Sequence, residues 1–208
     1  MKKIAGPVHI PIPGGKLSGE LRIPEGATGL VIFVQGSKSP RDHFVADYLR
    51  QHGMGTLLVD LLASEEEKCD IDFLKERVLQ VTAWVEEQKL HLPMGYFGTS
   101  RGAAAALAVA AANPKIRAIV SRGGSLDLVF DLLQKVKAPT LLIVGSYDFS
   151  GIERNQAAYL RMRCARQLIL VPRATQLFEE TGTLEEVAHL AAAWFYDCFA
   201  SRALKKSA

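Results

Sequence analysis

Ser100 is the residue of this chain whose type and spacing most clearly predict chemistry. It is the serine of a G-x-S-x-G pattern over residues 98–102, which falls between a short apolar segment and the alanine-rich segment 103–112. A serine on such a strand-to-helix turn has a strained backbone and closely packed neighbours, so glycine is favoured on both sides. The pattern predicts a nucleophile at Ser100 with the Arg101 amide as an oxyanion donor. An ordinary tight turn of an α/β protein is the alternative.

A nucleophile of this kind requires an acid and then a base later in the chain, in the order Ser, Asp, His. Asp148 follows the apolar segment 139–145, so we expect it at the carboxyl end of a buried strand, where a carboxylate can orient an imidazole. A turn or a helix cap is the alternative for Asp148. The base should follow the next strand, but the segment 172–178 contains no histidine.

The elements that would position these residues alternate along the chain. Residues 8–23 predict an antiparallel hairpin around 13–15, and continuously apolar segments such as 30–34 predict strands that are buried on both faces. Helical patterns separate these strands, among them 40–51 after a cap at Ser39, 125–136, 152–160, and 183–200 with capping-box spacing at its start. This alternation indicates an α/β fold with a mostly parallel sheet, helices on both faces and the hairpin at an antiparallel edge. No insertion occurs at 121–125, so no lid domain is expected.

Length and composition limit the possible classes of protein. The chain has 208 residues and is 49% hydrophobic, which indicates one domain over 1–208 with a core at about 8–200. The net charge is only +3 and the charged residues are interspersed along the chain, so nucleic acid is not an expected partner. The three cysteines lack ligand spacing, so no metal or cofactor is expected and a reducing compartment is favoured. No apolar run reaches membrane length, and we expect a cytoplasmic protein of undetermined oligomeric state.

The chain resembles the α/β-hydrolase superfamily, specifically the dienelactone-hydrolase-like members, from about Val8 to Ala200. The segments that carry the resemblance are 98–102, 120–124, 144–148 and 174–180. Similar proteins usually read Ala-Thr-His-Leu-Phe in the last segment, so the resemblance places Gln176 where the catalytic histidine stands. They also tend to carry His-Gly where this chain has Gln35 and Gly36, and the resemblance makes the Ser37 amide the second oxyanion donor.

Gln176 changes what the site can be expected to do. A carboxamide forms hydrogen bonds but does not titrate near neutral pH, so it cannot accept the serine proton and pass it to a leaving group. Of the five histidines, His43 is the nearest substitute, and we expect it to have a surface or helix-packing role instead.

The sequence therefore predicts a serine hydrolase of small carboxylic esters or lactones with weak or absent activity. The alternative is a catalytically inactive relative, natural or engineered, that acts as a ligand-binding or interaction module. Arg122 and Gln35 are candidate substrate-binding residues, because both follow buried strands. Arg101 and Arg122 together could hold a substrate carboxylate, although surface charge or a structural bond is the favoured role for their side chains.

Overall fold

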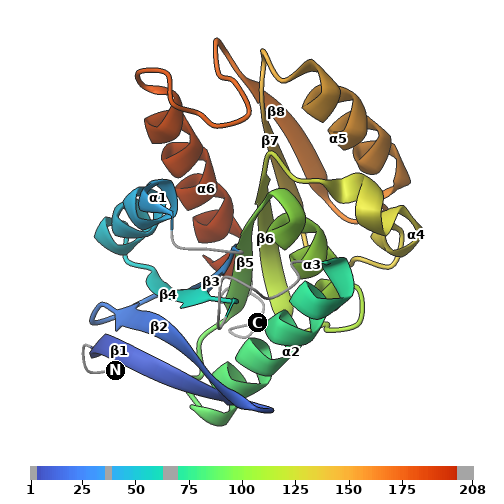
Figure 1. Cartoon of the computed structure of the whole chain (residues 1–208). Coiled ribbons are helices and arrows are strands. Elements are labelled where there is room, and N and C mark those ends of the chain that lie inside the picture. The colour runs from blue at the N-terminus through green and yellow to red at the C-terminus, as the bar shows by residue number, and fades with distance from the viewer. Residues whose placement is uncertain (1–3, 36–38, 63–69, 201–208) are drawn as a thin grey trace, which may run out of the picture.

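In a computed structural model, which describes residues 4–35, 39–62 and 70–200, helices cover both faces of an eight-stranded sheet (Figure 1). The strands are β1 (Ile4–Ile12), β2 (Gly15–Ile23), β3 (Leu30–Gln35), β4 (Gly55–Asp60), β5 (Met94–Thr99), β6 (Ile116–Arg122), β7 (Thr140–Gly145) and β8 (Arg166–Val171). Their order in the sheet is β1-β2-β4-β3-β5-β6-β7-β8. Strands β3 to β8 pair in parallel with one another, and the β1–β2 hairpin joins antiparallel to β4, which confirms the predicted fold class.

A separate hydrophobic core lies on each face of the sheet. The helices are α1 (Pro40–Gln51), α2 (Ile71–Glu87), α3 (Ser100–Ala110), α4 (Phe130–Leu133), α5 (Phe149–Arg161) and α6 (Thr183–Ala200), with the 3-10 helix η1 (Leu126–Val129) before α4. Helices α2, α3 and α5 cover one face, and α1 and α6 cover the other (Figure 1). In β3, the residues from Leu30 to Val34 are at most 1% exposed, because side chains on both sides of this strand are covered.

Helix α3 owes its position to its small side chains. The four alanines from Ala103 to Ala106 are fully buried, and they let the helix axis lie close to the sheet on one side and to α2 on the other. The helix begins directly where β5 ends. Ser100 is therefore held at the carboxyl edge of the sheet, the edge at which parallel α/β proteins place ligands.

Two helices differ from the sequence-based expectation. The segment 125–136 was expected to form one helix, but it forms η1 and the short α4. Buried Leu126 and Val129 are three residues apart, a spacing that fits a 3-10 turn as well as an α-helix. Helix α5 begins at Phe149 rather than at Ile152, because the Asp148 side chain caps its first turn.

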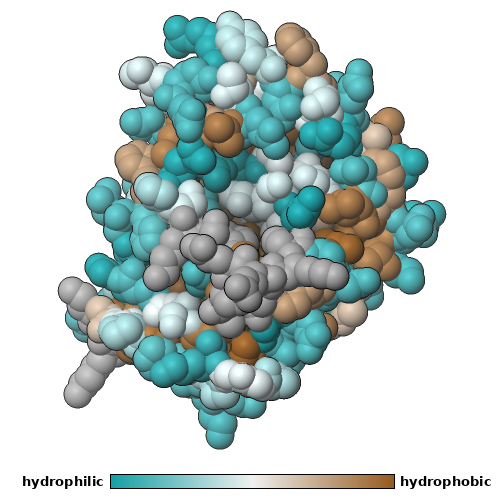
Figure 2. Space-filling model, in the orientation of Figure 1, coloured by the Kyte–Doolittle hydropathy of each residue, from teal (hydrophilic) through white to brown (hydrophobic). Residues whose placement is uncertain are grey.

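Within residues 4–35, 39–62 and 70–200, none of the helices has the length and apolar character needed to span a bilayer. The face of the molecule drawn in Figure 2 is mostly hydrophilic, with hydrophobic residues in small groups.

Candidate active site

Ser100 occupies a strained and accessible turn. It is exposed, and its φ is +48°, in the left-handed region that residues other than glycine rarely adopt. Two residues earlier, a Cβ added to Gly98 would lie 2.5 Å from the Cα atom of Ala103, so only glycine allows the helix to fold back so closely. The turn presents the serine side chain to solvent at the first turn of α3, where backbone amides lack partners within the helix.

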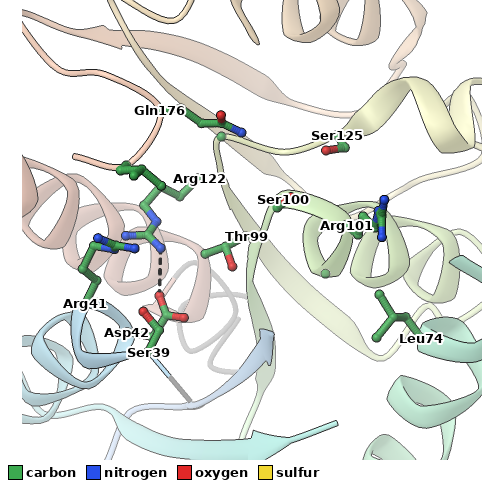
Figure 3. Close-up of a pocket in the computed structure, with 13 residues that line it drawn as sticks. Ser39, Arg41, Asp42, Leu74, Thr99, Ser100, Arg101, Arg122, Ser125 and Gln176 are labelled. Atoms are coloured by element: carbon green, nitrogen blue, oxygen red, sulfur yellow. Dashed lines mark hydrogen bonds and ion pairs between the residues drawn. The ribbon is translucent and has the colours of Figure 1, made fainter. Parts of the chain in front are cut away.

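The loop after β6 supports this turn from the side. The Ser125 amide donates a hydrogen bond of 3.1 Å to the Ser100 carbonyl oxygen. Ser100 and Ser125 both line an open cavity of about 540 Å³ at the carboxyl edge of the sheet. Gln176, from the loop after β8, lines the same cavity, as do Arg101 and Arg122. The structure therefore brings four of the predicted site residues together (Figure 3).

Gln176 contributes an exposed carboxamide to this cavity. Its Cγ atom lies 3.9 Å from the position of a Cβ added to Gly123, so the β8 loop faces the β6 loop. Within the described residues, the carboxamide forms no hydrogen bond with Ser100 or Asp148. The side chain at the predicted base position is therefore bonded to neither predicted partner, and it has no group that titrates near neutral pH.

Asp148 lies in a neighbouring loop and caps a helix. Its Oδ1 atom accepts a hydrogen bond of 2.9 Å from the Gly151 amide, in the first turn of α5. The Tyr147 amide donates to the Ala174 carbonyl oxygen at 2.9 Å, which joins the Asp148 loop to the loop that carries Gln176. Among the described residues, those that line the cavity do not include Asp148. The structure therefore shows Asp148 as a helix cap, and its role as catalytic acid stays a prediction.

A buried ion pair forms one wall of the cavity. The Arg122 Nη2 atom donates to Asp42 Oδ1 at 3.1 Å, and the two side chains are 8% and 2% exposed (Figure 3). Burial raises the pKa of Asp42 above its usual value even though Arg122 opposes the shift, and burial lowers the pKa of Arg122. Within the described residues, the buried Arg122 Nη1 atom has no hydrogen-bond partner. Arg122 thus has a structural bond to Asp42 and one buried guanidinium nitrogen without a partner.

One residue of the cavity wall, Asp42, was not predicted from the sequence, and two predicted positions lie outside the described residues. Asp42 received no role, because its partner is 80 positions away and no local pattern indicates the pair. Figure 3 shows Arg101 and Arg122 on opposite sides of Ser100, and their joint binding of a substrate carboxylate stays a prediction. The Gln35 side chain and the Ser37 amide lie outside the described residues.

The histidines do not supply the missing base from another part of the chain. All five lie within the described ranges, and none of them lines the cavity at Ser100. His43 lines a different cavity, beside β2 and β4. Its expected role away from the nucleophile therefore agrees with its position.

The fold and the turn at Ser100 define an α/β-hydrolase. Comparison of structures gives a dienelactone hydrolase from Anabaena variabilis with a TM-score of 0.90 and 42% identity, which covers 95% of this chain and 99% of that one. The esterase Est1E from Butyrivibrio proteoclasticus has a TM-score of 0.83 at 16% identity, over 94% of this chain and 99% of that one, and shows a shared fold. This chain belongs to the dienelactone hydrolase family, and its fold is of the hydrolase and esterase type.

Two Mycobacterium tuberculosis proteins, which carry a provisional phosphoribosyl transferase name, are 48% identical to the chain over 207 residues. The match covers 93% of this chain and 45% of each relative, so the chain spans about half the length of these curated relatives. No family model matches the sequence.

Proposed function

We propose that the cavity at Ser100 is a hydrolase site for small carboxylic esters or lactones, and that its turnover is slow because Gln176 replaces the base. The positive φ of an exposed serine on the cavity wall is the observation that carries this proposal. A strained conformation of this kind persists only where the surrounding structure enforces it, and it clusters at reactive sites.

The proposed chemistry is acyl transfer through Ser100. The Oγ atom attacks the ester carbonyl carbon, the carbonyl oxygen becomes an oxyanion, and the amides of Arg101 and Ser37 hold that charge at the positive end of α3. The serine proton must go to water, because the Gln176 carboxamide cannot accept it. Collapse of the intermediate releases the alcohol, which takes a proton from water, and a second water molecule hydrolyses the acyl-serine.

The absence of a base sets the expected size of the effect. In a serine-protease series, loss of the histidine costs about 10⁶-fold in turnover, and roughly 10³- to 10⁴-fold acceleration over water remains from the oxyanion hole and binding. Asp148 in this scheme is an acid without an imidazole to orient. Arg122, which lines the cavity, would contact an acidic substituent of the substrate.

The direct test is covalent labelling of Ser100. We expect a fluorophosphonate probe to modify the native chain slowly and to modify Ser100→Ala not at all, as detected by intact-protein mass spectrometry. Hydrolysis of an activated aryl ester should fall to the buffer rate in Ser100→Ala. Equal labelling or equal hydrolysis by the two proteins would exclude Ser100 as the nucleophile.

A second candidate function is ligand binding without turnover. The cavity and its buried Arg122–Asp42 pair support this function, because both exist independently of a base. Calorimetric binding of a small carboxylic ester by native protein that neither labels at Ser100 nor hydrolyses the ester would favour this candidate over the hydrolase.

A further inference from the structure

Asn155 is a fully buried polar residue of α5 that joins two parts of the site. Its Nδ2 atom donates one hydrogen bond of 2.9 Å to the Gly151 carbonyl oxygen, one turn earlier in the helix. It donates a second, of 3.0 Å, to the Gly124 carbonyl oxygen in the loop after β6, which is 31 positions away. The two donated hydrogen bonds link the two segments, while the Asn155 Oδ1 atom has no hydrogen-bond partner within the described residues.

On the loop side, the hydrogen bond from Asn155 reaches the segment that supports the nucleophile turn. Gly124 is followed by Ser125, whose amide donates to the Ser100 carbonyl oxygen at 3.1 Å. A Cβ added to Gly124 would lie 2.3 Å from Ser121 Oγ and 3.0 Å from Ala103 Cβ, so the loop packs tightly against the start of α3. A change in the position of this loop would therefore change the position of Ser100.

On the helix side, the same amide reaches the turn that holds Asp148. Asn155 binds the Gly151 carbonyl oxygen, and the Gly151 amide donates to Asp148 Oδ1 at 2.9 Å. A Cβ added to Gly151 would lie 1.9 Å from Asp148 Oδ2, so this turn closes directly around the carboxylate. One glycine peptide thus lies between Asn155 and the predicted acid.

We infer that Asn155 is a positioning residue, which sets the Ser100 turn and the Asp148 cap relative to each other through the Gly124 and Gly151 carbonyl oxygens. The inference rests on the proposed function for its catalytic meaning. Without the Asn155 amide, the buried Gly124 carbonyl oxygen loses this donor and the loop beside Ser100 can shift. A displacement of about 1 Å at a nucleophile lowers the rate by up to about 10²-fold.

The test compares Asn155→Ala with Ser121→Ala as a matched control. Ser121 is also fully buried beside Gly124, but its Oγ atom has no hydrogen-bond partner within the described residues, so its removal breaks no such bond. We expect Asn155→Ala to lower the rate of fluorophosphonate labelling and kcat for an aryl ester by roughly 10- to 10²-fold, with KM changed less than about 3-fold. Ser121→Ala should stay within about 2-fold of the native chain in all three quantities.

A readout without catalysis separates this inference from the proposed function. Hydrogen exchange of the Ser125 amide should become at least about 10-fold faster in Asn155→Ala, after correction for the exchange of the Ile32 amide in the central strand β3. Ser100→Ala tests the nucleophile. The Ser125 exchange rate tests the hydrogen bond from Asn155 to the Gly124 loop, even in a protein that hydrolyses nothing.

The inference is overturned if folded Asn155→Ala loses thermal stability while its Ser125 exchange, relative to Ile32, and its kcat match those of the native chain. If Asn155→Ala does not fold, Asn155→Leu takes its place, because leucine is similar in size to asparagine and has no hydrogen-bond donor. Native Ser125 protection and native kcat in folded Asn155→Leu would equally overturn it.

Discussion

The two walls that face each other across the cavity differ in how firmly their residues are held. On the β5 and β6 side, Ser100 is fixed by Gly98 and by the hydrogen bond from Ser125, and Arg122 is buried against Asp42. On the β8 side, Gln176 is exposed and its neighbour Leu177 is 49% exposed, on the surface of a loop. We call these the fixed wall and the exposed wall.

The difference shows that the tightly packed part of the proposed site is present, whereas the part that needs a single titratable side chain is not. Strained backbone and buried charge on the fixed wall require many supporting contacts. A base on the exposed wall requires only one titratable side chain, but Gln176 at the predicted position carries a carboxamide, which does not titrate. Substitutions on the exposed wall should therefore change the rate with little effect on stability, and substitutions on the fixed wall should change stability. The comparison can be tested wall by wall.

Restoring a base should give the largest effect. We expect Gln176→His to raise kcat for an activated aryl ester by roughly 10²- to 10⁴-fold, a part of the about 10⁶-fold attributed to such a histidine, with an apparent pKa for the base near neutrality in the pH profile. The free energy of unfolding should change by less than about 0.5 kcal/mol, because residue 176 is exposed.

Gln176→Asn is the matched control for this gain, because it also alters the side chain but adds no titratable group. An unchanged kcat in Gln176→His would show that position 176 is not the base site.

Breaking the buried pair should give the next largest effect, on the fixed wall. Arg122→Met leaves the Asp42 carboxyl buried without its guanidinium, which costs about 3 to 5 kcal/mol of unfolding free energy in urea titrations. Arg122→Met with Asp42→Leu should recover most of that loss, because it removes both charges. A single variant as stable as the native chain would contradict the assignment of these residues to a firmly held wall.

Crowding the nucleophile turn should give a smaller loss of stability. In Gly98→Ala the new Cβ would lie 2.5 Å from the backbone Cα atom of Ala103, which cannot move aside as a side chain would. We expect a loss of about 1 to 3 kcal/mol in unfolding free energy and much slower fluorophosphonate labelling. Gly6→Ala is the control, because an added Cβ there has no heavy atom within 4 Å. Equal stability of the two variants would show that the turn is not tight.

Removal of the helix cap at Asp148 should give the smallest loss of stability. Its effect on the rate should depend on the residue at position 176 of the exposed wall. Asp148→Ala should lower the unfolding free energy by about 1 kcal/mol through loss of the bond to the Gly151 amide. The ester rate of the native chain should not change, since Gln176 needs no acid, whereas in Gln176→His the same substitution should lower kcat at least about 10-fold. Asp131→Ala, an exposed substitution, serves as control. An equal response in both backgrounds would exclude Asp148 as the acid.

Much of the fold could be predicted because its signals are local. Continuous apolar segments such as Leu30 to Val34 predict buried strands, and the bounds of α1 and α6 followed from cap residues and periodicity. The expected single helix over 125–136 was wrong, because a spacing of three residues between buried positions does not distinguish a 3-10 turn from an α-helix.

The candidate site could be predicted in part, for the residues that one motif or one strand end identifies. Ser100 and Gln176 do line one cavity, as the order of strands implied. The Arg122–Asp42 pair and the contacts of Asn155 could not be predicted, because each joins residues from different elements through burial. Periodicity and composition do not indicate which buried polar groups form hydrogen bonds with each other.

By itself, the order of residues determined the type of fold, the glycine-flanked serine and the carboxamide where a base is expected, because these depend on side-chain type and on spacing within single elements. Only the tertiary structure decided that Ser100 adopts positive φ on an open cavity, that Asp148 caps a helix, and that Asn155 joins their two loops. The physical reason is that strain and buried hydrogen bonds exist only after distant segments have packed together.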